Sequence, residues 1–435
     1  MGLDWVYKPK TRVLCWFGVD ETNAQRIFGL RVAQGRWLLI AVGFGINVCM
    51  GSVYAYSVFR NPIQELFSTS TFESGLPYMT FQVVLAILMF FGGRLIVTIG
   101  PAKVGVIGGL LVGGGWILSG LVARVIPSIW TLVAMYGVLG GAGVGLAYGG
   151  PLAIATRWFP ERKGLAVGLT ITGFGASPFV TANLAQPLIA EKGPLTAFLT
   201  MGIAFLVIMV VLSSLLRLPQ ADWQPAVDAR TTRVGQATHE IDTATMVRTS
   251  TFRGLFAVYV IGCVSGLMAI GISSPVATDV IKLNAATAAT LVGVFAIVNG
   301  AGRPVFGALT DRITPRWTAV LSMGIILGAS LLMLGASAET VPLYIVCFSA
   351  LWACHGAWLT LAPTATAYFF GPKHYPRNYG VVFFAYGVGA IIANVVSGNS
   401  KDLFGSYDVA FAIVAGLAVL GAVVSIRLLK PPRTE

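Results

Sequence analysis

Twelve apolar segments recur along this chain of 435 residues, and each is long enough to form a helix that crosses a lipid bilayer. Unpaired backbone groups are so costly in lipid that such segments must be helical. We expect spans at 36–59, 75–97, 104–124, 129–156, 164–190, 195–216, 253–275, 285–309, 317–337, 341–369, 376–398 and 407–428. The sequence therefore predicts an all-α membrane protein with twelve transmembrane helices.

The composition supports this class and excludes a soluble one. Hydrophobic residues make up 56% of the chain and charged residues only 11%, whereas soluble domains carry about 25% charged residues. The 52 glycines suit helices that pack closely through small faces. The five cysteines, with no CxxC or Cys/His spacing, are best interpreted as small packing residues and predict no metal site.

The positive charges are distributed unevenly between the predicted loops. With the N-terminus in the cytoplasm, 23 of the 29 Lys and Arg residues fall on cytoplasmic segments, five fall on outer loops, and Arg303 lies within a span. This bias follows the positive-inside rule. It predicts cytoplasmic termini and a place in the cell membrane, which we expect to be a prokaryotic inner membrane. The net charge of +12 then gives no support to a nucleic-acid partner.

A polar stretch divides the spans into two groups of six. It runs from Arg217 to Arg248 and contains Pro219 and Pro225, which is typical of a flexible linker. The predicted organisation is a cytoplasmic tail, a first half, a cytoplasmic linker, a second half and a short tail at 1–35, 36–216, 217–252, 253–428 and 429–435.

Related loops follow the second span of each half. The second copy is GALTDRITPR, with Asp311 and Arg312, and the first copy is GRLIVTIGPAK, in which Val97 and Thr98 replace that pair. Two six-helix halves with such loops resemble the major facilitator superfamily, which implies a substrate site near the midplane and alternating access by rocking. Asp311 and Arg312 are candidate gating residues.

A basic cluster follows the fourth span. Arg157 and Arg162 in this cluster could gate against acidic residues such as Asp311, or could act only as topology anchors. The residues alone leave both roles open.

Arg303 lies in an otherwise uncharged apolar segment, LVGVFAIVNGAGRPVFGAL. A guanidinium keeps its proton, so its burial in a membrane is costly unless an anion or polar groups meet it. Asn299 precedes it by one helical turn and shares its face. Because no Asp or Glu lies in the interior of any predicted span, a carried organic anion is the expected partner. The alternative is a structural arginine whose donors are satisfied by backbone carbonyls.

Several stretches resemble the oxalate:formate antiporter family and, more distantly, the monocarboxylate transporters. The most specific is RWFPERKGLAVG at Arg157–Gly168; others are GSVYAYSVF at Gly51–Phe59, GAGVGLAYGGP at Gly141–Pro151, NGAGR at Asn299–Arg303 and AYG at Ala385–Gly387. The resemblance implies that Arg303 binds a substrate carboxylate and that Tyr148 and Tyr386 line the cavity.

One departure from that family concerns the number of positive charges. The oxalate antiporter has a lysine on its eleventh helix, where this chain has Tyr386. A second carboxylate would then be desolvated without a cation. We therefore expect monocarboxylates such as lactate, pyruvate or formate, with oxalate as the less favoured alternative.

Further aromatic residues could form the walls of the site. Tyr54, Tyr56 and Trp358 carry hydrogen-bond donors that could orient a small acid. Each could instead be a packing or interfacial aromatic. Because residues two apart do not share a helix face, we expect only one of Tyr54 and Tyr56 to line the path.

The coupling mode stays open between anion exchange and proton symport. Proton-coupled monocarboxylate transporters have an Asp where Asn299 stands and a Lys near Val58, and neither is present here. His355 is the remaining intramembrane group suited to carrying a proton, although a lone histidine is more often a packing residue. The absence of a cavity carboxylate favours exchange modestly.

No nucleotide-binding loop, metal cluster or nucleophile triad occurs in the sequence, so we expect no cofactor and no enzyme activity. Two rivals remain besides a carboxylate carrier. One is a facilitator for a sugar or a drug, which would tolerate Arg303→Gln. The other is a membrane sensor of organic acids, which would need a cytoplasmic output domain larger than the tail at 1–35 or the linker at 217–252.

Overall fold

The computed structural model describes residues 26–159, 162–219, 240–371 and 373–432. Helices dominate the described residues, and the strands are the two-residue pair β1 (Arg26–Ile27) and β2 (Leu30–Arg31). The first half contains α1 (Val32–Met50), η2 (Gly51–Ala55), α2 (Ser57–Phe67), α3 (Thr71–Ile99), α4 (Pro101–Val125), α5 (Ile129–Leu132), η3 (Val133–Gly140), α6 (Gly141–Ala147), α7 (Gly149–Trp158), α8 (Lys163–Lys192) and α9 (Pro194–Ser214). The second half contains α10 (Thr243–Met246), α11 (Ser250–Pro275), η5 (Val276–Val280), α12 (Ala285–Met333), α13 (Val341–Phe370), α14 (Tyr375–Val382), α15 (Phe384–Phe404) and α16 (Asp408–Leu428).

The predicted spans are confirmed as membrane-length helices. Within the described ranges, 11 helical runs are long and apolar enough to cross a membrane. One of them, α12, has 49 residues and is interrupted at Thr314, which has φ 75° and ψ 155°. The break divides it into two spans, so the prediction of twelve transmembrane helices holds.

The break at Thr314 repeats a turn of the first half. Gly100, between α3 and α4, has φ 87° and ψ 157°, and both residues precede a proline. This region of backbone space favours glycine, and another residue held there costs about 1–3 kcal/mol. The two related loops in the sequence thus fold alike, but the second copy carries strain that the first avoids.

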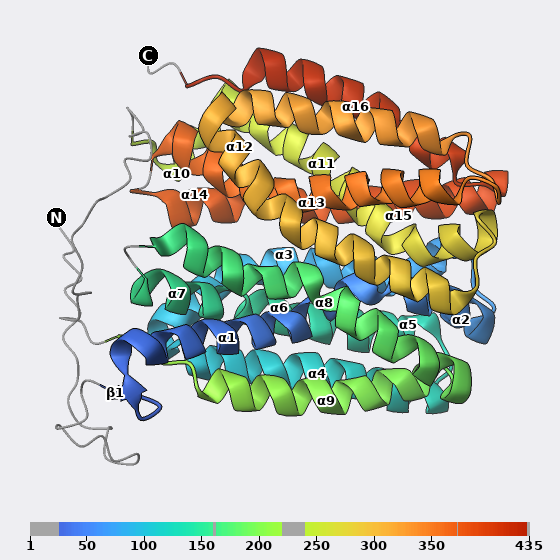
Figure 1. Ribbon diagram of the computed structural model, residues 1–435, viewed down its shortest axis with the longest axis horizontal. Coiled ribbons are helices and arrows are strands. Elements are labelled where there is room, and N and C mark those ends of the chain that lie inside the picture. Colours follow the sequence, from blue (N-terminus) through green and yellow to red (C-terminus); the bar gives the residue numbers. More distant parts are fainter. Residues whose placement is uncertain (1–25, 160–161, 220–239, 372, 433–435) are drawn as a thin grey trace.

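The two halves lie side by side, as Figure 1 shows with the first half in blue to green and the second in yellow to red. Helix α8 packs along α12, and α3 packs along α15, and these four helices form most of the interface between the halves. We call the end of the bundle where α1 begins and α16 ends the terminal end, and the opposite end the distal end. The predicted domain limits stay a prediction, and the tail at 1–25 and the linker at 220–239 lie outside the described residues.

The end of the linker that the structure describes docks on the second half. The Ile241 amide donates to Phe370 O at 3.0 Å. The Asn378 side chain donates to Ile241 O at 2.9 Å and accepts from Thr243 at 2.7 Å. Asn378 is fully buried, so this part of the linker is held against the start of α14.

The first transmembrane helix is not uniform. Between α1 and α2 it tightens into the 3-10 segment η2, Gly51–Ala55. A side chain at Gly51 would clash with the backbone of Phe174 on α8. This close approach brings Tyr54 of η2 to the middle of the bundle, where it faces the second half.

The distal end is closed by hydrogen bonds between the halves. Asn61 of α2 donates to Asp279 at 2.9 Å and to Thr278 at 3.2 Å. The Asp402 carboxylate on α15 accepts from Thr71 N at 2.7 Å and Phe72 N at 2.8 Å, the first amides of α3. A carboxylate at a helix N-terminus is stabilised by the unpaired amides and the helix dipole.

Arg60 is one of the five basic residues that the charge distribution assigned to outer loops, and this assignment requires a correction. Arg60 lies inside α2 and is only 2% exposed. Its three nitrogens donate to Ser74 Oγ at 3.3 Å, Gly271 O at 3.1 Å and Thr71 O at 2.8 Å. Gly271 belongs to α11, so Arg60 also joins the two halves.

Candidate functional site

Arg303 lies at the centre of the interface between α8 and α12. It is 2% exposed, and its Nη1 donates to the carbonyl of Ile171 on α8 at 2.8 Å. Its Nη2 makes a long contact of 3.5 Å with Asn299 Oδ1, and its buried Nε has no hydrogen-bond partner. The guanidinium therefore links the two halves and still has an N–H donor, at Nε, that is not used.

Asn299 supports this arrangement from the preceding turn of α12. Its amide nitrogen donates to Trp352 O on α13 at 2.8 Å, which leaves its oxygen directed at Arg303. On the other side, a Cβ at Gly175 of α8 would meet both Asn299 Oδ1 and Arg303 Nη2. The bare backbone at Gly175 thus lets α8 approach the arginine closely.

Tyr148 stands beside Arg303 from the first half. It follows α6, is half-buried, and its side chain interacts with the guanidinium. Its ring meets Phe174 edge-on at a centroid distance of 5.6 Å. Asn299, expected from helical spacing, and Tyr148, expected from the family resemblance, therefore approach Arg303 from opposite halves.

A chain of polar side chains crosses the centre between the halves. The Tyr54 hydroxyl lies 3.1 Å from His355 Nε2 and 3.1 Å from the Tyr386 hydroxyl. All three side chains are almost completely buried, and the second nitrogen of His355, Nδ1, has no hydrogen-bond partner. Arg303 lies within electrostatic range of both Tyr54 and His355.

The two first-helix tyrosines take different positions. Tyr54 joins the central chain, whereas the Tyr56 hydroxyl donates to Ser74 O at 2.8 Å. The Tyr56 ring stacks on Tyr78 and Tyr136 within the first half. Tyr56 therefore has the surroundings of a packing residue.

Trp358 lies on α13, three residues after His355. Its ring stacks on Tyr259 at a centroid distance of 6.1 Å, and its buried indole nitrogen has no partner. It packs against Gly262 of α11. The structure thus brings Trp358 close to the central chain but gives it no contact with Arg303.

The candidate gating residues lie apart from the centre, toward the terminal end. Asp311, Arg312, Arg157 and Arg162 are all exposed. In the part of the chain that the structure describes, Asp311 makes no ion pair with either Arg157 or Arg162. Their gating role stays a prediction.

One central residue escaped the sequence analysis. Gln82 on α3 is fully buried, and neither amide atom has a hydrogen-bond partner of good geometry. Buried polar groups are normally paired, so each exception needs an explanation such as a bound ligand or water. A glutamine in the middle of the apolar run LPYMTFQVVLAIL was a signal that could have found it.

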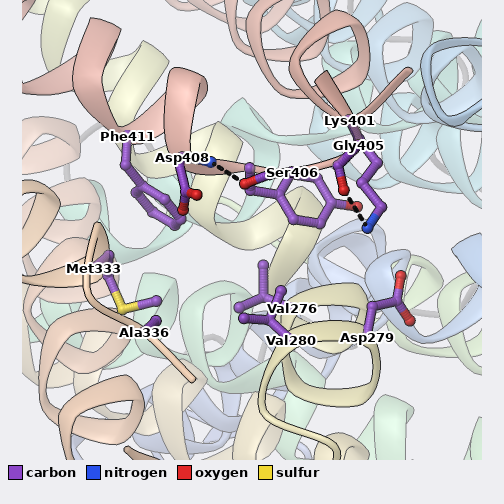
Figure 2. Close-up of a pocket in the computed structure, with 11 residues that line it drawn as sticks. Val276, Asp279, Val280, Met333, Ala336, Lys401, Gly405, Ser406, Asp408 and Phe411 are labelled. Carbon is purple, nitrogen blue, oxygen red and sulfur yellow. Dashed lines mark hydrogen bonds between the residues drawn. The ribbon is translucent and has the colours of Figure 1, made fainter. Parts of the chain in front are cut away.

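A cavity of about 300 Å³ opens at the distal end of the second half, away from Arg303. Figure 2 shows Asp279, Lys401 and Asp408 around it, with Lys401 donating to Gly405 O at 3.1 Å. Burial raises the pKa of Tyr407, which also lines it, to about 12. Asp279 and Lys401 are occupied by hydrogen bonds with Asn61, Thr278 and Gly405, and the cavity lies apart from the central site.

Comparison with known proteins identifies relatives over most of the chain. The family described as Major Facilitator Superfamily matches residues 40–276 and 255–435. The chain is 26% identical over 386 residues to the oxalate:formate antiporter of Oxalobacter formigenes, a match that covers 87% of this chain and 88% of that protein. It is 26% identical over 411 residues to monocarboxylate transporter 12 of Rattus norvegicus, with 88% and 83% covered.

Solved structures share the fold. The nucleoside transporter NupG superposes with a TM-score of 0.71 over 91% of this chain and 100% of that chain, at 12% identity. A bacterial homologue of the human lysosomal transporter Spinster, in an inward-facing and unoccupied conformation, superposes with a TM-score of 0.62 over 92% of this chain and 98% of that chain, at 14% identity.

Proposed function

Because this chain belongs to the Major Facilitator Superfamily, we propose that it is a secondary transporter that carries small carboxylate anions across the cell membrane. The observation that carries the proposal is the central Arg303, which is buried, unpaired with any acid among the described residues, and left with a free Nε donor. A carboxylate would satisfy that donor through a charge-assisted bond.

The charge balance of the site favours a monocarboxylate. Arg303 is the formal cation at the centre, and Tyr386 contributes a neutral hydroxyl. A monoanion such as lactate, pyruvate or formate would neutralise the guanidinium, whereas the second carboxylate of oxalate would lack a cation. Relatives named as an oxalate:formate antiporter and as monocarboxylate transporters support this substrate class.

The surroundings of His355 favour exchange over proton symport. A protonated imidazole needs two hydrogen-bond acceptors, but Nδ1 of His355 is buried without any partner. An empty site also leaves the charge of Arg303 uncompensated, which should slow the return of an unloaded carrier. Exchange of one acid anion for another avoids that step.

The same proposal includes an orientation. If both termini are cytoplasmic, as the charge bias predicts, the distal end faces outward. The hydrogen bonds of Arg60, Asn61 and Asp402 then close the outer side of the carrier. Asp311, Arg312, Arg157 and Arg162 would lie at the cytoplasmic side, in position to form the alternative closure.

A counterflow assay tests the proposal. Purified protein in liposomes preloaded with unlabelled pyruvate should take up labelled pyruvate, lactate or formate, and liposomes without protein serve as the control. Uptake that depends on internal acid and not on an imposed pH gradient supports exchange. If no acid of a panel that also includes oxalate is taken up, the carboxylate assignment is wrong.

Tyr386→Lys tests the charge balance. The added ammonium should shift the preference toward oxalate, because each carboxylate would then meet a cation. An unchanged ratio of oxalate to pyruvate uptake would remove this explanation of specificity.

A further inference from the structure

The position of the His355 proton can be deduced from what surrounds its ring. Nε2 lies 3.1 Å from the Tyr54 hydroxyl, while Nδ1 is buried without a partner. The Nδ1 edge packs against Gly266 of α11, where a Cβ would overlap the imidazole, so a Cα–H of Gly266 occupies that place. A nitrogen lone pair tolerates such a C–H, whereas an N–H there would be an orphaned donor. The proton therefore belongs on Nε2.

This tautomer gives the central chain a direction. Nε2–H donates to the oxygen of Tyr54, and Tyr54 then uses its one proton to donate to the oxygen of Tyr386. No other acceptor of the Tyr386 proton is present among the described residues. That proton is consequently free to be donated to a ligand.

We infer that His355 is a positioning residue that acts through Tyr54 to make Tyr386 a hydrogen-bond donor to the substrate. This inference rests on the proposed function. The guanidinium fork of Arg303 can engage both oxygens of one carboxylate. Tyr386 then donates to the next oxygen of the molecule. The preferred class is small monoacids with a neutral acceptor oxygen beside the carboxylate, such as 2-oxo acids, over plain alkanoic acids.

The discriminating measurement is the ratio of KM values for propionate and pyruvate, which differ in the 2-oxo oxygen. The wild-type KM should be roughly tenfold higher for propionate than for pyruvate, because the Tyr386 hydroxyl finds no acceptor on propionate. Tyr386→Phe and His355→Leu should each reduce the ratio to within about twofold. His355→Gln keeps an N–H donor near the Nε2 position and should preserve most of the preference.

A double variant tests whether His355 acts through its hydrogen bond to Tyr54 or has only a structural role. If His355 acts only by directing Tyr386, the variant with both His355→Leu and Tyr386→Phe should be no worse than Tyr386→Phe alone. Additive losses would overturn the inference, as would a wild type that transports propionate and pyruvate equally. Tyr344→Phe is the matched control, since Tyr344 is a buried tyrosine whose hydroxyl donates to Ser273 O at 2.7 Å inside the second half.

The tautomer is tested without any substrate. Nitrogen-15 spectra of the histidine-labelled full-length protein at pH 7.5, compared with those of His355→Gln, isolate the His355 signal from those of His239 and His374. A neutral ring protonated on Nε2 is expected. A ring protonated on Nδ1, or on both nitrogens, would overturn the directed chain even if transport of carboxylates is established. Failure of all acids in the counterflow panel with the expected tautomer would instead reject the proposed function and, with it, the assigned substrate class.

Discussion

The two buried arginines among the described residues have equal exposure but different surroundings. Arg60 and Arg303 are each 2% exposed, and neither forms an ion pair with an acid in the described ranges. Arg60 uses all three nitrogens, with two of them on backbone carbonyls. Arg303 leaves Nε without a partner and reaches Asn299 only at 3.5 Å.

The difference separates a structural arginine from a ligand-ready one. A guanidinium whose donors are all matched by fixed backbone groups stabilises the contact that supplies them, here the contact of α2 and α3 with α11. A guanidinium with an unmatched donor has a cost that an incoming anion can remove. Burial alone would not have distinguished the distal contact from the candidate site.

The largest expected effect is at Arg303. Arg303→Lys keeps the charge but loses the planar fork, so exchange of labelled pyruvate should fall by about 100-fold. Protein abundance in the membrane should be unchanged. If this variant exchanged pyruvate at the wild-type rate, Arg303 would be a structural arginine like Arg60.

Arg60→Lys is the matched change at the distal end. One ammonium cannot reproduce the spread of the three acceptors, so the free energy of unfolding should decrease by about 2 kcal/mol. Thermal unfolding measures this loss. The KM for pyruvate, measured by counterflow, should stay within about twofold of the wild-type value. A loss of affinity as large as that of Arg303→Lys would place Arg60 in the substrate path.

A smaller effect is expected for Asp402→Asn. The amide keeps one acceptor for the first amides of α3 but loses the charge that complements the helix dipole, which is worth about 1 kcal/mol. The midpoint of thermal unfolding should lie between those of the wild type and Arg60→Lys. Glu339→Gln, at an exposed loop residue of the same end that lies outside any helix, should leave stability unchanged.

The smallest effect is expected away from both arginines. Thr314→Gly should raise the free energy of unfolding by about 0.5–1 kcal/mol, because glycine relieves the backbone strain at φ 75° but costs some chain entropy. Thr310→Gly, in the regular part of the same helix, should lower it by about 1 kcal/mol. If both substitutions changed the free energy of unfolding in the same direction, the strain explanation would be wrong.

The sequence alone predicted the helices well, because apolar length is a local property. All twelve spans were found, and even the division of α12 was expected from the loop that contains Asp311 and Pro315. The prediction of Arg303 as a buried, centrally placed group also depended only on its own apolar segment. Its juxtaposition with Asn299 followed from helical spacing.

The contacts of the distal end could not be predicted in this way. Arg60 and Asp402 stand just beyond apolar runs, where the sequence gives no sign of a partner in the other half. Their partners are Gly271 O, Thr71 N and Phe72 N, which are backbone groups that any sequence would supply. The hydrogen-bonded chain through Tyr54 was equally hidden, because its partners are 301 and 332 residues away.

The glycines of α11 have a mechanical consequence. Gly266 receives the imidazole of His355 and Gly262, one turn earlier, receives the indole of Trp358. Because neither glycine has a side chain, both rings of α13 pack directly against the backbone of α11. A tilt of α11 relative to α13 would therefore have to displace both rings together, and through His355 it would also reach the hydrogen bond to Tyr54.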